Sequence, residues 1–567
     1  MPELYELPSY SALKEYANKQ KCIHLRDLLK NEVRNSCLTV NSGEIFMDFT
    51  RQNLDEEGFE LLIKLATESN LMEKIKLQLR GGIINSTEKR AVLHTALRSK
   101  SNIPITLASG QNVLNDVNEV NRRIFKFANA IRKGELLGST GKILKDVICI
   151  GIGGSYLGPE FVYEALRTTQ EGFEASMGRR LRFLANVDPI DIRRATEGFH
   201  PETTLVVIVS KTFTTAETIL NAKTIKEWLH KTLKSEVAVS KHLAAVSTNI
   251  KATSDFGIPV DHVFGFWDWV GGRFSVCSAV GLVPLSIHFG ANILQEFLDG
   301  CWDMDQHYET APVSKNLPVL LGLVGVYNST FMDKNCVAVL PYCEALCKFP
   351  AHVQQLLMES NGKSSSIDGN MLHDKIKTGA IFFGEPGTNA QHSFYQLLHQ
   401  GRNTTNCEFI GFAKSQCDSQ ILGDPISNHD ELMCNFFAQP DALAIGKTQR
   451  ELNLEDCPEN LIPHKLFQGN RSSISLLLPI CNAYYIGQLL ALYEHRTAVE
   501  GFILNINSFD QYGVELGKVL AKDIRNIISL KKTNSPPEII QNKEEKIPGP
   551  TRRLIDFYLR LSQNPTN

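Results

Sequence analysis

The stretch VVIVSKTFTTAET, residues 206–218, joins a short apolar run to a cluster of polar side chains. Its first four residues have the profile of a buried strand, and the pattern that follows is typical of a helix. Between the two stand Ser210, Lys211, Thr212, Thr214 and Thr215. Where a parallel strand ends and a helix begins, free amide protons and the helix dipole favour an anion. The stretch therefore predicts a phosphate site.

A simpler interpretation of the same stretch is that a threonine hydroxyl only caps the helix. Capping would explain Thr214 or Thr215, or both. It would not explain Ser-Lys-Thr at the end of the strand, so phosphate binding is the favoured interpretation.

Similar apolar runs recur on both sides of this stretch and alternate with amphipathic segments. In the first half of the chain they cover residues 145–154, 179–188, 203–212 and 242–248. In the second half they cover residues 335–343, 379–387 and 406–414. This rhythm predicts two α/β domains, each with a mostly parallel, doubly wound sheet flanked by helices.

Helical patterns lie at both ends of the 567-residue chain. We expect a mainly helical N-terminal segment and a C-terminal helix followed by an extended arm, and we expect residues 476–505 to form a long apolar helix or a helix pair. The predicted divisions are 1–115, 116–290, 291–512 and 513–567.

The composition limits the kinds of partner and compartment. A net charge of −3 gives no bulk attraction to nucleic acid or to an anionic membrane. The N-terminus lacks the apolar core of a secretory signal, and no apolar run approaches the roughly 18–20 residues of a membrane span. The 13 cysteines include no CxxC pair, which favours a reduced, cytoplasmic protein.

A glycine-rich loop follows the first predicted strand. CIGIGGSYLGPE, residues 149–160, places Gly154 and Ser155 where backbone can approach a ligand. It is not a dinucleotide fingerprint, because that motif needs glycine where Tyr156 stands. SNGKSS fails as a Walker loop, since its first glycine would be Leu357. No cofactor is predicted.

Further polar residues suggest carbon-acid chemistry. Arg273 follows Gly271 and Gly272, so a guanidinium stands on backbone that can approach a small substrate. Gln355 and Glu359 would share one face of a helix. The other candidates are His392, Gln511 and Lys518. Taken singly, Glu359, His392 and Lys518 are more simply interpreted as a helix surface charge, a loop histidine and a solvated lysine. His392 and His399 lack the companions of a metal site, so no metal is predicted.

Taken together, these stretches resemble the glucose-6-phosphate isomerase family almost end to end. The motifs are INSTEKRAVLHTALR, IGIGGSYLGP, VSKTFTTAET, FWDWVGGRFSVCSAVGL, LLMESNGKS, GTNAQHSFYQLLHQG and NSFDQYGVELGK. The resemblance implies two sugar isomerase (SIS) domains with the active site between them. It implies no metal and no organic cofactor.

The resemblance also assigns roles. Ser210, Lys211, Thr212 and Thr215 match the loop that holds the sugar's 6-phosphate; Gly154, Ser155 and Gly272 line the pocket, and Glu217 supports the loop. His392 and Lys518 match the residues that open the sugar ring. Glu359 matches the base that moves a proton between C2 and C1. Arg273 matches the group that stabilises the enediolate. Gln355 and Gln511 match residues that orient the sugar hydroxyls.

The implied reaction is the exchange of glucose 6-phosphate and fructose 6-phosphate in glycolysis and gluconeogenesis, by a homodimer in which His392 reaches the neighbouring subunit's site. The sequence departs from the family pattern at positions such as Tyr156 and Ala390. These residues border the pocket, and every position that matches a catalytic residue of the family is retained. Three alternatives stay open: a sugar-phosphate sensor without turnover, an interaction protein acting outside the cell, and an enzyme that also isomerises mannose 6-phosphate.

Overall fold

The computed structural model describes residues 3–417 and 423–563. Residue contacts divide it into two compact units, one ending at Phe509 and one beginning at Asp510. Within the first unit, the helices before the first sheet are α1 (Pro8–Gln20), α2 (Leu25–Leu28), α3 (Glu32–Cys37), α4 (Glu56–Glu68) and α5 (Leu71–Leu79). A small antiparallel pair, β3 (Ile83–Asn85) and β4 (Arg90–Ala91), follows them.

The first large sheet has five parallel strands in the order β6-β5-β7-β8-β9. They are β5 (Asp146–Ile150), β6 (Arg180–Leu184), β7 (Thr204–Val209), β8 (Leu243–Val246) and β9 (Val263–Phe264). The chain winds outward in both directions from β5 and β7, so the switch point lies between these neighbours. Ligands of open α/β sheets bind at such a point, beyond the carboxyl ends of the strands.

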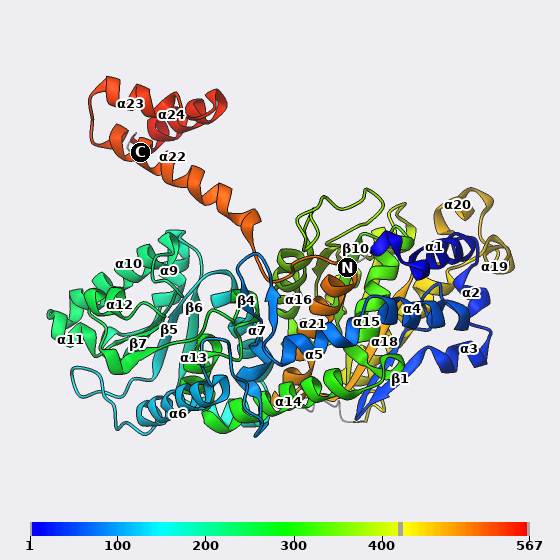
Figure 1. Ribbon diagram of the computed structural model, residues 1–567, viewed down its shortest axis with the longest axis horizontal. Helices are drawn as coiled ribbons and strands as arrows, with labels where there is room; N and C mark the ends of the chain where they lie inside the picture. Colours follow the sequence, from blue (N-terminus) through cyan, green and yellow to red (C-terminus); the bar gives the residue numbers. More distant parts are fainter. Residues whose placement is uncertain (1–2, 418–422, 564–567) are drawn as a thin grey trace. The chain divides into compact units, whose positions relative to one another are not determined.

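Helices cover both faces of this sheet, as Figure 1 shows. They are α6 (Val113–Arg132), α7 (Leu157–Leu166), α8 (Gln170–Ser176), α9 (Pro189–Thr196), α10 (Ala216–Leu233), α11 (Glu236–Ser240), α12 (Ile250–Phe256) and α13 (Ala279–Phe289). Along β5, Val147 and Cys149 join the main core, whereas Ile148 and Ile150 pack in a second core with α10. This alternation explains why the strand reads as a continuous apolar run.

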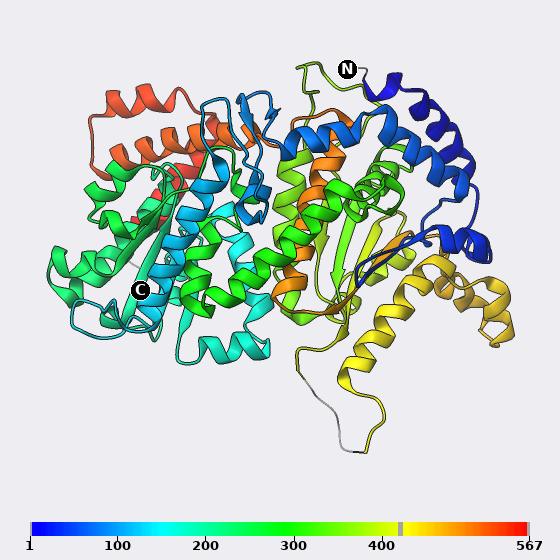
Figure 2. The same cartoon turned by 60° about the horizontal axis from the view of Figure 1, so that its bottom comes forward.

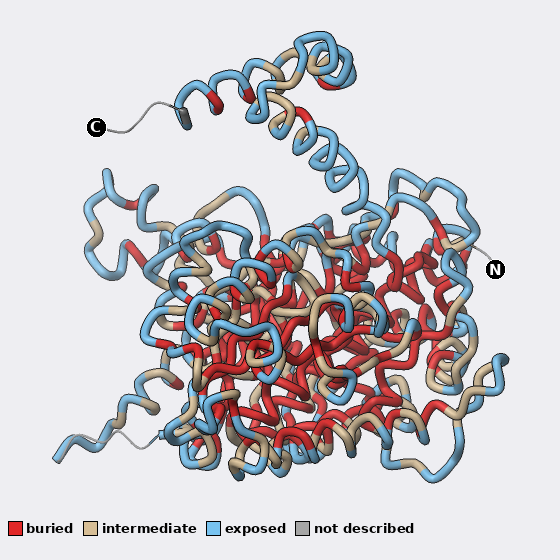
Figure 3. The backbone as a smooth tube through the Cα atoms, turned by 90° about the vertical axis from the view of Figure 1, so that its left-hand side faces the viewer, coloured by how far each residue is buried: buried red, intermediate tan, exposed pale blue. Residues whose placement is uncertain are grey.

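The second large sheet has the order β1-β2-β13-β12-β10-β11, in which β1 covers Thr39–Ser42 and β2 covers Ile45–Asp48. Four strands are parallel: β10 (Cys336–Pro341), β11 (Ile381–Gly384), β12 (Asn406–Lys414) and β13 (Ser473–Ile480). Its helices are α14 (Ala291–Thr310), α15 (Leu317–Val326), α16 (Phe349–Gln354), α17 (Tyr395–Gln400), α18 (Asn428–Ile445), α19 (Gln449–Leu454), α20 (Ile462–Lys465) and α21 (Ala483–Leu504). The long helices α14 and α21 pack together (Figure 2), and the buried residues lie in the interior of this unit (Figure 3).

The predicted fold class is confirmed, with two corrections in detail. The segment 476–505 is not helical throughout, because Leu476–Ile480 lies in β13; a short apolar run has no period that separates a strand from a helix. Besides β3 and β4, the N-terminal segment also supplies β1 (Thr39–Ser42) and β2 (Ile45–Asp48) to the second sheet, where β2 pairs antiparallel with β13. The division into domains remains a prediction.

The second unit contains three helices, α22 (Glu515–Lys532), α23 (Pro537–Glu544) and α24 (Gly549–Gln563). Ile527, Ile547, Ile555 and Leu559 form its core. The predicted extended arm therefore contains a helix, α23, which begins at a proline of the kind tolerated in a first helical turn.

One apolar segment of the described chain, Gly272–Phe289, is long enough to cross a membrane by length and composition. It is 94% buried inside the protein, as a core helix would be. All 13 cysteines are free thiols.

Candidate active site

The glycine loop after β5 packs directly on the glycines before Arg273. A β-carbon on Gly154 would lie 2.2 Å from the carbonyl oxygen of Gly272, a distance that no side chain tolerates. Gly153 has φ +58°, and a β-carbon there would lie 3.1 Å from the Gln355 amide nitrogen. Ser155 ends the same turn. The absence of side chains thus lets three segments meet at the carboxyl end of β5.

The predicted phosphate loop follows β7, the strand beside β5. The Ser210 hydroxyl donates to Thr215 Oγ1 at 3.3 Å, and the Thr212 and Thr214 hydroxyls lie 2.6 Å apart. Thr215 is the N-cap residue of α10, yet its side chain makes no capping hydrogen bond. Helix capping therefore does not account for these hydroxyls.

Lys211 is held between the loop and the segment before Arg273. Its ammonium lies 3.2 Å from Asp268 Oδ1 and donates to the Val270 carbonyl at 3.5 Å. Burial lowers the pKa of Lys211 below its ordinary value, and the Asp268 carboxylate opposes this shift. Glu217 lies half-buried in the first turn of α10.

Gln355 and Glu359 meet on a short π-helix that continues α16. The Gln355 amide donates to Glu359 Oε2 at 3.0 Å, so the predicted shared face is correct. Arg273 Nη1 lies 3.5 Å from the same carboxylate oxygen. The same Glu359 oxygen therefore accepts a hydrogen bond from a neutral amide and lies beside a cation.

Hydrogen bonds to two serine residues fix the guanidinium of Arg273. Its side chain is 1% exposed; Nε donates to the Ser360 hydroxyl at 2.6 Å and Nη2 to the Ser508 carbonyl at 2.6 Å. A planar guanidinium that donates to separate acceptors has little rotational freedom.

A buried network supports these acceptors. The Ser508 hydroxyl donates to Asn361 Oδ1 at 2.6 Å, and the Asn361 amide donates to Glu500 Oε2 at 3.2 Å. Glu500 accepts from Arg496, which also pairs with Glu408 at 2.6 Å. The position of Arg273 thus depends on buried ionic groups of α21 and β12.

The remaining predicted residues are His392, Gln511 and Lys518. His392 ends a short 3-10 helix, Asn389–His392, where it is exposed, and its ring makes no hydrogen bond to the described part of the chain. Gln511 and Lys518 belong to the second unit, Lys518 on α22. Their roles remain predictions.

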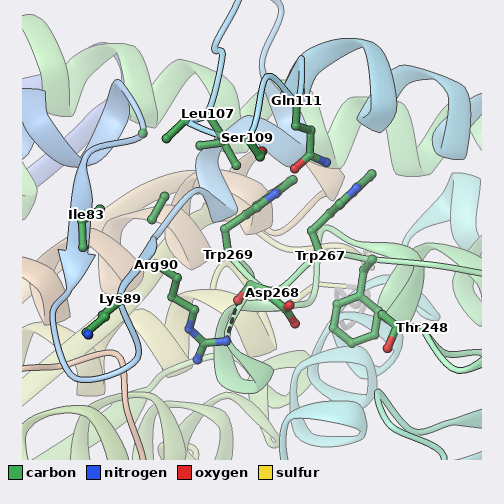
Figure 4. A pocket seen from close by; sticks show the side chains of 14 residues that line it. Ile83, Lys89, Arg90, Leu107, Ser109, Gln111, Thr248, Trp267, Asp268 and Trp269 are labelled. Carbon is green, nitrogen blue, oxygen red and sulfur yellow. Dashed lines mark hydrogen bonds between the residues drawn. The ribbon is translucent and has the colours of Figure 1, made fainter.

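A cavity of about 460 Å³ lies beside the predicted phosphate loop (Figure 4). The Trp267 and Trp269 rings stack in its wall with centroids 4.7 Å apart, and Arg90 donates to the Asp268 carbonyl at 2.6 Å. Thr248 lines it and donates to the Lys211 carbonyl at 2.8 Å. None of the predicted site residues lines this cavity. The cavity therefore lies next to the candidate site and is not part of it.

Sequence reasoning missed the partners that hold the site together. Asp268 and Ser508 lie inside quoted motifs, FWDWVGGRFS and NSFDQYGVELGK, and Ser360 directly follows Glu359. The position of Asp268 between two tryptophans was the one feature of the sequence that could have indicated a partner for Lys211. Nothing in the sequence indicated that the Ser508 carbonyl faces Arg273.

The described residues contain no group of three or more His, Cys, Asp or Glu side chains placed to hold a metal ion. The donors that do converge, an arginine, a lysine, amides and hydroxyls, are suited to an anionic, hydroxylated ligand.

Comparison with known proteins agrees with this chemistry. Residues 48–537 match the family described as phosphoglucose isomerase. The chain is 52% identical over 557 residues to a cytosolic glucose-6-phosphate isomerase of Arabidopsis thaliana, covering 98% of each chain. It is 54% identical over 516 residues to the cytosolic enzyme of Zea mays, covering 91% of this chain and 90% of the other. Among solved structures, a glucose-6-phosphate isomerase of Chlamydia trachomatis aligns with a TM-score of 0.83 and 33% identity, covering 93% of this chain and 97% of that one.

Proposed function

The chain belongs to the phosphoglucose isomerase family, and on that premise we propose how its residues interconvert glucose 6-phosphate and fructose 6-phosphate. The observation that carries the proposal is the shared contact of Glu359 with Gln355 and Arg273. It places a general base beside a fixed cation, the pair that proton transfer next to a carbonyl needs.

The 6-phosphate binds at the loop after β7. Ser210, Thr212 and Thr215 supply hydroxyl donors, Lys211 supplies a charge, and the amides at the start of α10 complete the site. Gly154, Ser155 and Gly272 let the sugar approach the backbone. Glu217 supports the loop.

Ring opening precedes isomerisation, because the closed sugar has no carbonyl. It requires a proton to leave a hydroxyl while the ring oxygen gains one, and we assign this work to His392 and Lys518. Gln355 and Gln511 orient the sugar hydroxyls. The exposure of His392 supports a homodimer in which this histidine completes the neighbouring subunit's site.

In the open sugar, Glu359 removes the proton from C2 and returns it to C1 on the same face. The negative charge passes from the carboxylate to the enediolate oxygens, which stay close to the Arg273 guanidinium. A preorganised donor of this kind is typically worth about 3–4 kcal/mol in the transition state. The chain's own residues suffice for every step of this scheme.

The relatives from Arabidopsis thaliana and Zea mays are named as cytosolic enzymes, which supports a cytoplasmic location and a role in glycolysis and gluconeogenesis. A sensor that binds fructose 6-phosphate without converting it would not need the Arg273–Glu359 pair. The test is turnover of fructose 6-phosphate by the purified chain with a metal chelator present. Formation of glucose 6-phosphate is expected, and binding without conversion would favour the sensor.

A further inference from the structure

A buried tyrosine lies beside the turn that carries His392. Strand β10 ends at Pro341, and Tyr342 follows it with only 1% of its surface exposed. The turn, residues 385–392, comes after β11, the strand that pairs in parallel with β10. The backbone N–H of Gly387 in this turn donates to the Pro341 carbonyl at 3.0 Å. The adjacent ends of the two strands therefore bring Tyr342 and the turn together.

The backbone of the turn packs directly against the ring of Tyr342. A β-carbon on Gly387 would lie 2.5 Å from Cζ of that ring, a separation that side-chain atoms do not tolerate. Further along the turn, Ala390 is buried and belongs to the same apolar cluster as Tyr342 and Tyr395. The turn therefore has an apolar inner side that contacts Tyr342, whereas His392 is exposed.

The hydroxyl of Tyr342 holds the residue next to His392. The Gln391 amide donates to this hydroxyl oxygen at 2.9 Å. The same oxygen lies 3.2 Å from the hydroxyl oxygen of Tyr395, the first residue of α17. Burial raises the pKa of Tyr342, so its hydroxyl keeps its proton and can donate as well as accept. One buried hydroxyl thus links the end of the turn to the helix that follows it.

Tyr342 itself has little freedom to move. Its backbone N–H donates to the Ile410 carbonyl of β12 at 2.7 Å. Its ring contacts those of Phe409 and Phe436, with centroids 5.9 and 5.8 Å apart. The His392 ring makes no hydrogen bond to the described part of the chain, so its position depends on the turn. A side chain that is locked by packing and by the sheet can hold such a turn precisely.

We propose that Tyr342 is a positioning residue for His392: its ring and hydroxyl fix the turn so that the imidazole meets the sugar in the orientation that ring opening needs. The inference rests on the ring-opening role that we propose for His392. When the closed ketose opens, the C2 hydroxyl loses a proton, the bond between C2 and the ring oxygen breaks, and the ring oxygen gains a proton. Tyr342 acts through the turn and takes no part in this proton transfer. A catalytic group displaced by about 1 Å can lose about 10²-fold in rate.

The test compares two substrates that differ in the hydroxyl that closes the ring. Fructose 6-phosphate must be opened, whereas 5-deoxyfructose 6-phosphate lacks the hydroxyl that forms the ring and is always open. Tyr342→Phe removes the hydroxyl of Tyr342 and keeps its ring. Relative to wild type, we expect kcat/KM for fructose 6-phosphate to fall roughly 10- to 100-fold, while kcat/KM for the open substrate is nearly unchanged. Equal losses for both substrates, or no loss for either, would overturn the proposal.

A second variant removes the other partner of the same hydrogen bond. Gln391→Leu should also slow fructose 6-phosphate selectively, and adding it to Tyr342→Phe should cost little more, because both remove one interaction. Full additivity of the two losses would contradict their shared role. Tyr327→Phe is the matched control, since it deletes a buried hydroxyl that donates to the Asn53 carbonyl at 2.8 Å and belongs to a different apolar cluster. A selective loss in this control as well would overturn the proposal.

The variant His392→Gln separates this inference from the proposed function. It should slow fructose 6-phosphate strongly and leave conversion of the open substrate nearly intact. If it slows both substrates equally, the ring-opening role of His392 is wrong and the inference fails with it. If wild type converts neither substrate, the isomerase proposal itself fails, and this inference with it. The expected result in His392→Gln without a selective loss in Tyr342→Phe would overturn the positioning role alone.

Discussion

The guanidinium of Arg273 lies 3.5 Å from the carboxylate of Glu359, from Nη1 to Oε2. Arg273 stands between the first sheet and α13, whereas Glu359 lies beyond β10 of the second sheet. The contact therefore joins the two α/β halves where we propose that the reaction takes place. In the mechanism that we propose, the cation balances the base in the free site, and during proton transfer the same cation faces the charge that moves onto the substrate.

The substitution Arg273→Lys should distinguish the contribution of the positive charge from that of the guanidinium geometry. Lysine keeps the positive charge but cannot donate to both Ser360 and Ser508 as the guanidinium does. We expect kcat to fall by roughly 10²–10³, the typical cost of losing one preorganised donor, with a smaller change in KM. Steady-state kinetics in both directions provide the measurement.

The matched control for that substitution is Ser508→Ala. It removes the hydroxyl that donates to Asn361 but keeps the backbone carbonyl that accepts from Arg273. We expect a smaller loss of kcat than in Arg273→Lys. Wild-type kcat in Arg273→Lys would show that the fixed guanidinium geometry is unnecessary.

Substituting Lys211→Met should weaken phosphate binding without disabling the base. A hydrogen bond to a charged group contributes about 1.5–3 kcal/mol, so KM should rise roughly 10- to 100-fold while kcat changes less. Competition by inorganic phosphate should weaken in parallel. Lys241→Met, at an exposed lysine after α11, is the control and should behave as wild type. A fall in kcat at unchanged KM would indicate that Lys211 takes part in the chemical step and does not bind the phosphate.

Mixed dimers test whether His392 acts on the neighbouring subunit. His392→Gln and Glu359→Gln should each be nearly inactive. In a heterodimer of the two, one site regains an intact Glu359 and an intact His392 from different chains. Random reassociation of two equal pools should recover about a quarter of wild-type activity. No recovery, with heterodimers demonstrated by mass spectrometry, would place His392 in its own subunit's site.

Lys334 should make stability depend on pH. It is buried with Asn53 and Ser472, and burial lowers its pKa to about 7. Between about pH 7 and the unfolded value near 10.4, the unfolded chain binds a proton that the folded chain lacks. The free energy of unfolding should therefore rise with pH there, by up to about 1.4 kcal/mol per unit.

The variant Lys334→Met provides the measurement for this effect. Its lost hydrogen bonds lower stability at every pH, but its unfolding free energy should lack the extra rise seen in wild type above about pH 7. Denaturant unfolding at several pH values compares the slopes. Parallel curves would show that Lys334 does not titrate in this range.

Local patterns were enough to predict the sheets and the loops that follow them. The apolar run before Ser210 is β7, and the run before the glycine loop is β5. Their adjacency follows from the winding of a parallel sheet, which places both loops at one switch point. The four-residue spacing of Gln355 and Glu359 predicted a shared face, and the two side chains are hydrogen bonded.

Contacts between distant segments were not predictable in this way. Strand β2 joins β13 although hundreds of residues separate them, because the edge of the second sheet needs a partner for its backbone groups. The support of Arg273 by the Ser508 carbonyl involves a backbone atom, which residue type does not reveal. The carboxylate of Asp268 lies beside the Lys211 ammonium, but residue type does not show which distant cation a carboxylate faces.

Proton exchange tests the central claim, that Glu359 is the base of an enediolate mechanism. Wild type and Glu359→Gln are incubated with fructose 6-phosphate in heavy water, with metal chelated, and followed by NMR. Glucose 6-phosphate that carries deuterium at C2 should form with wild type, and conversion and exchange should fall by at least about 10²-fold in the variant. Undiminished exchange in Glu359→Gln would contradict the account, as would conversion by wild type without any deuterium entering at C2.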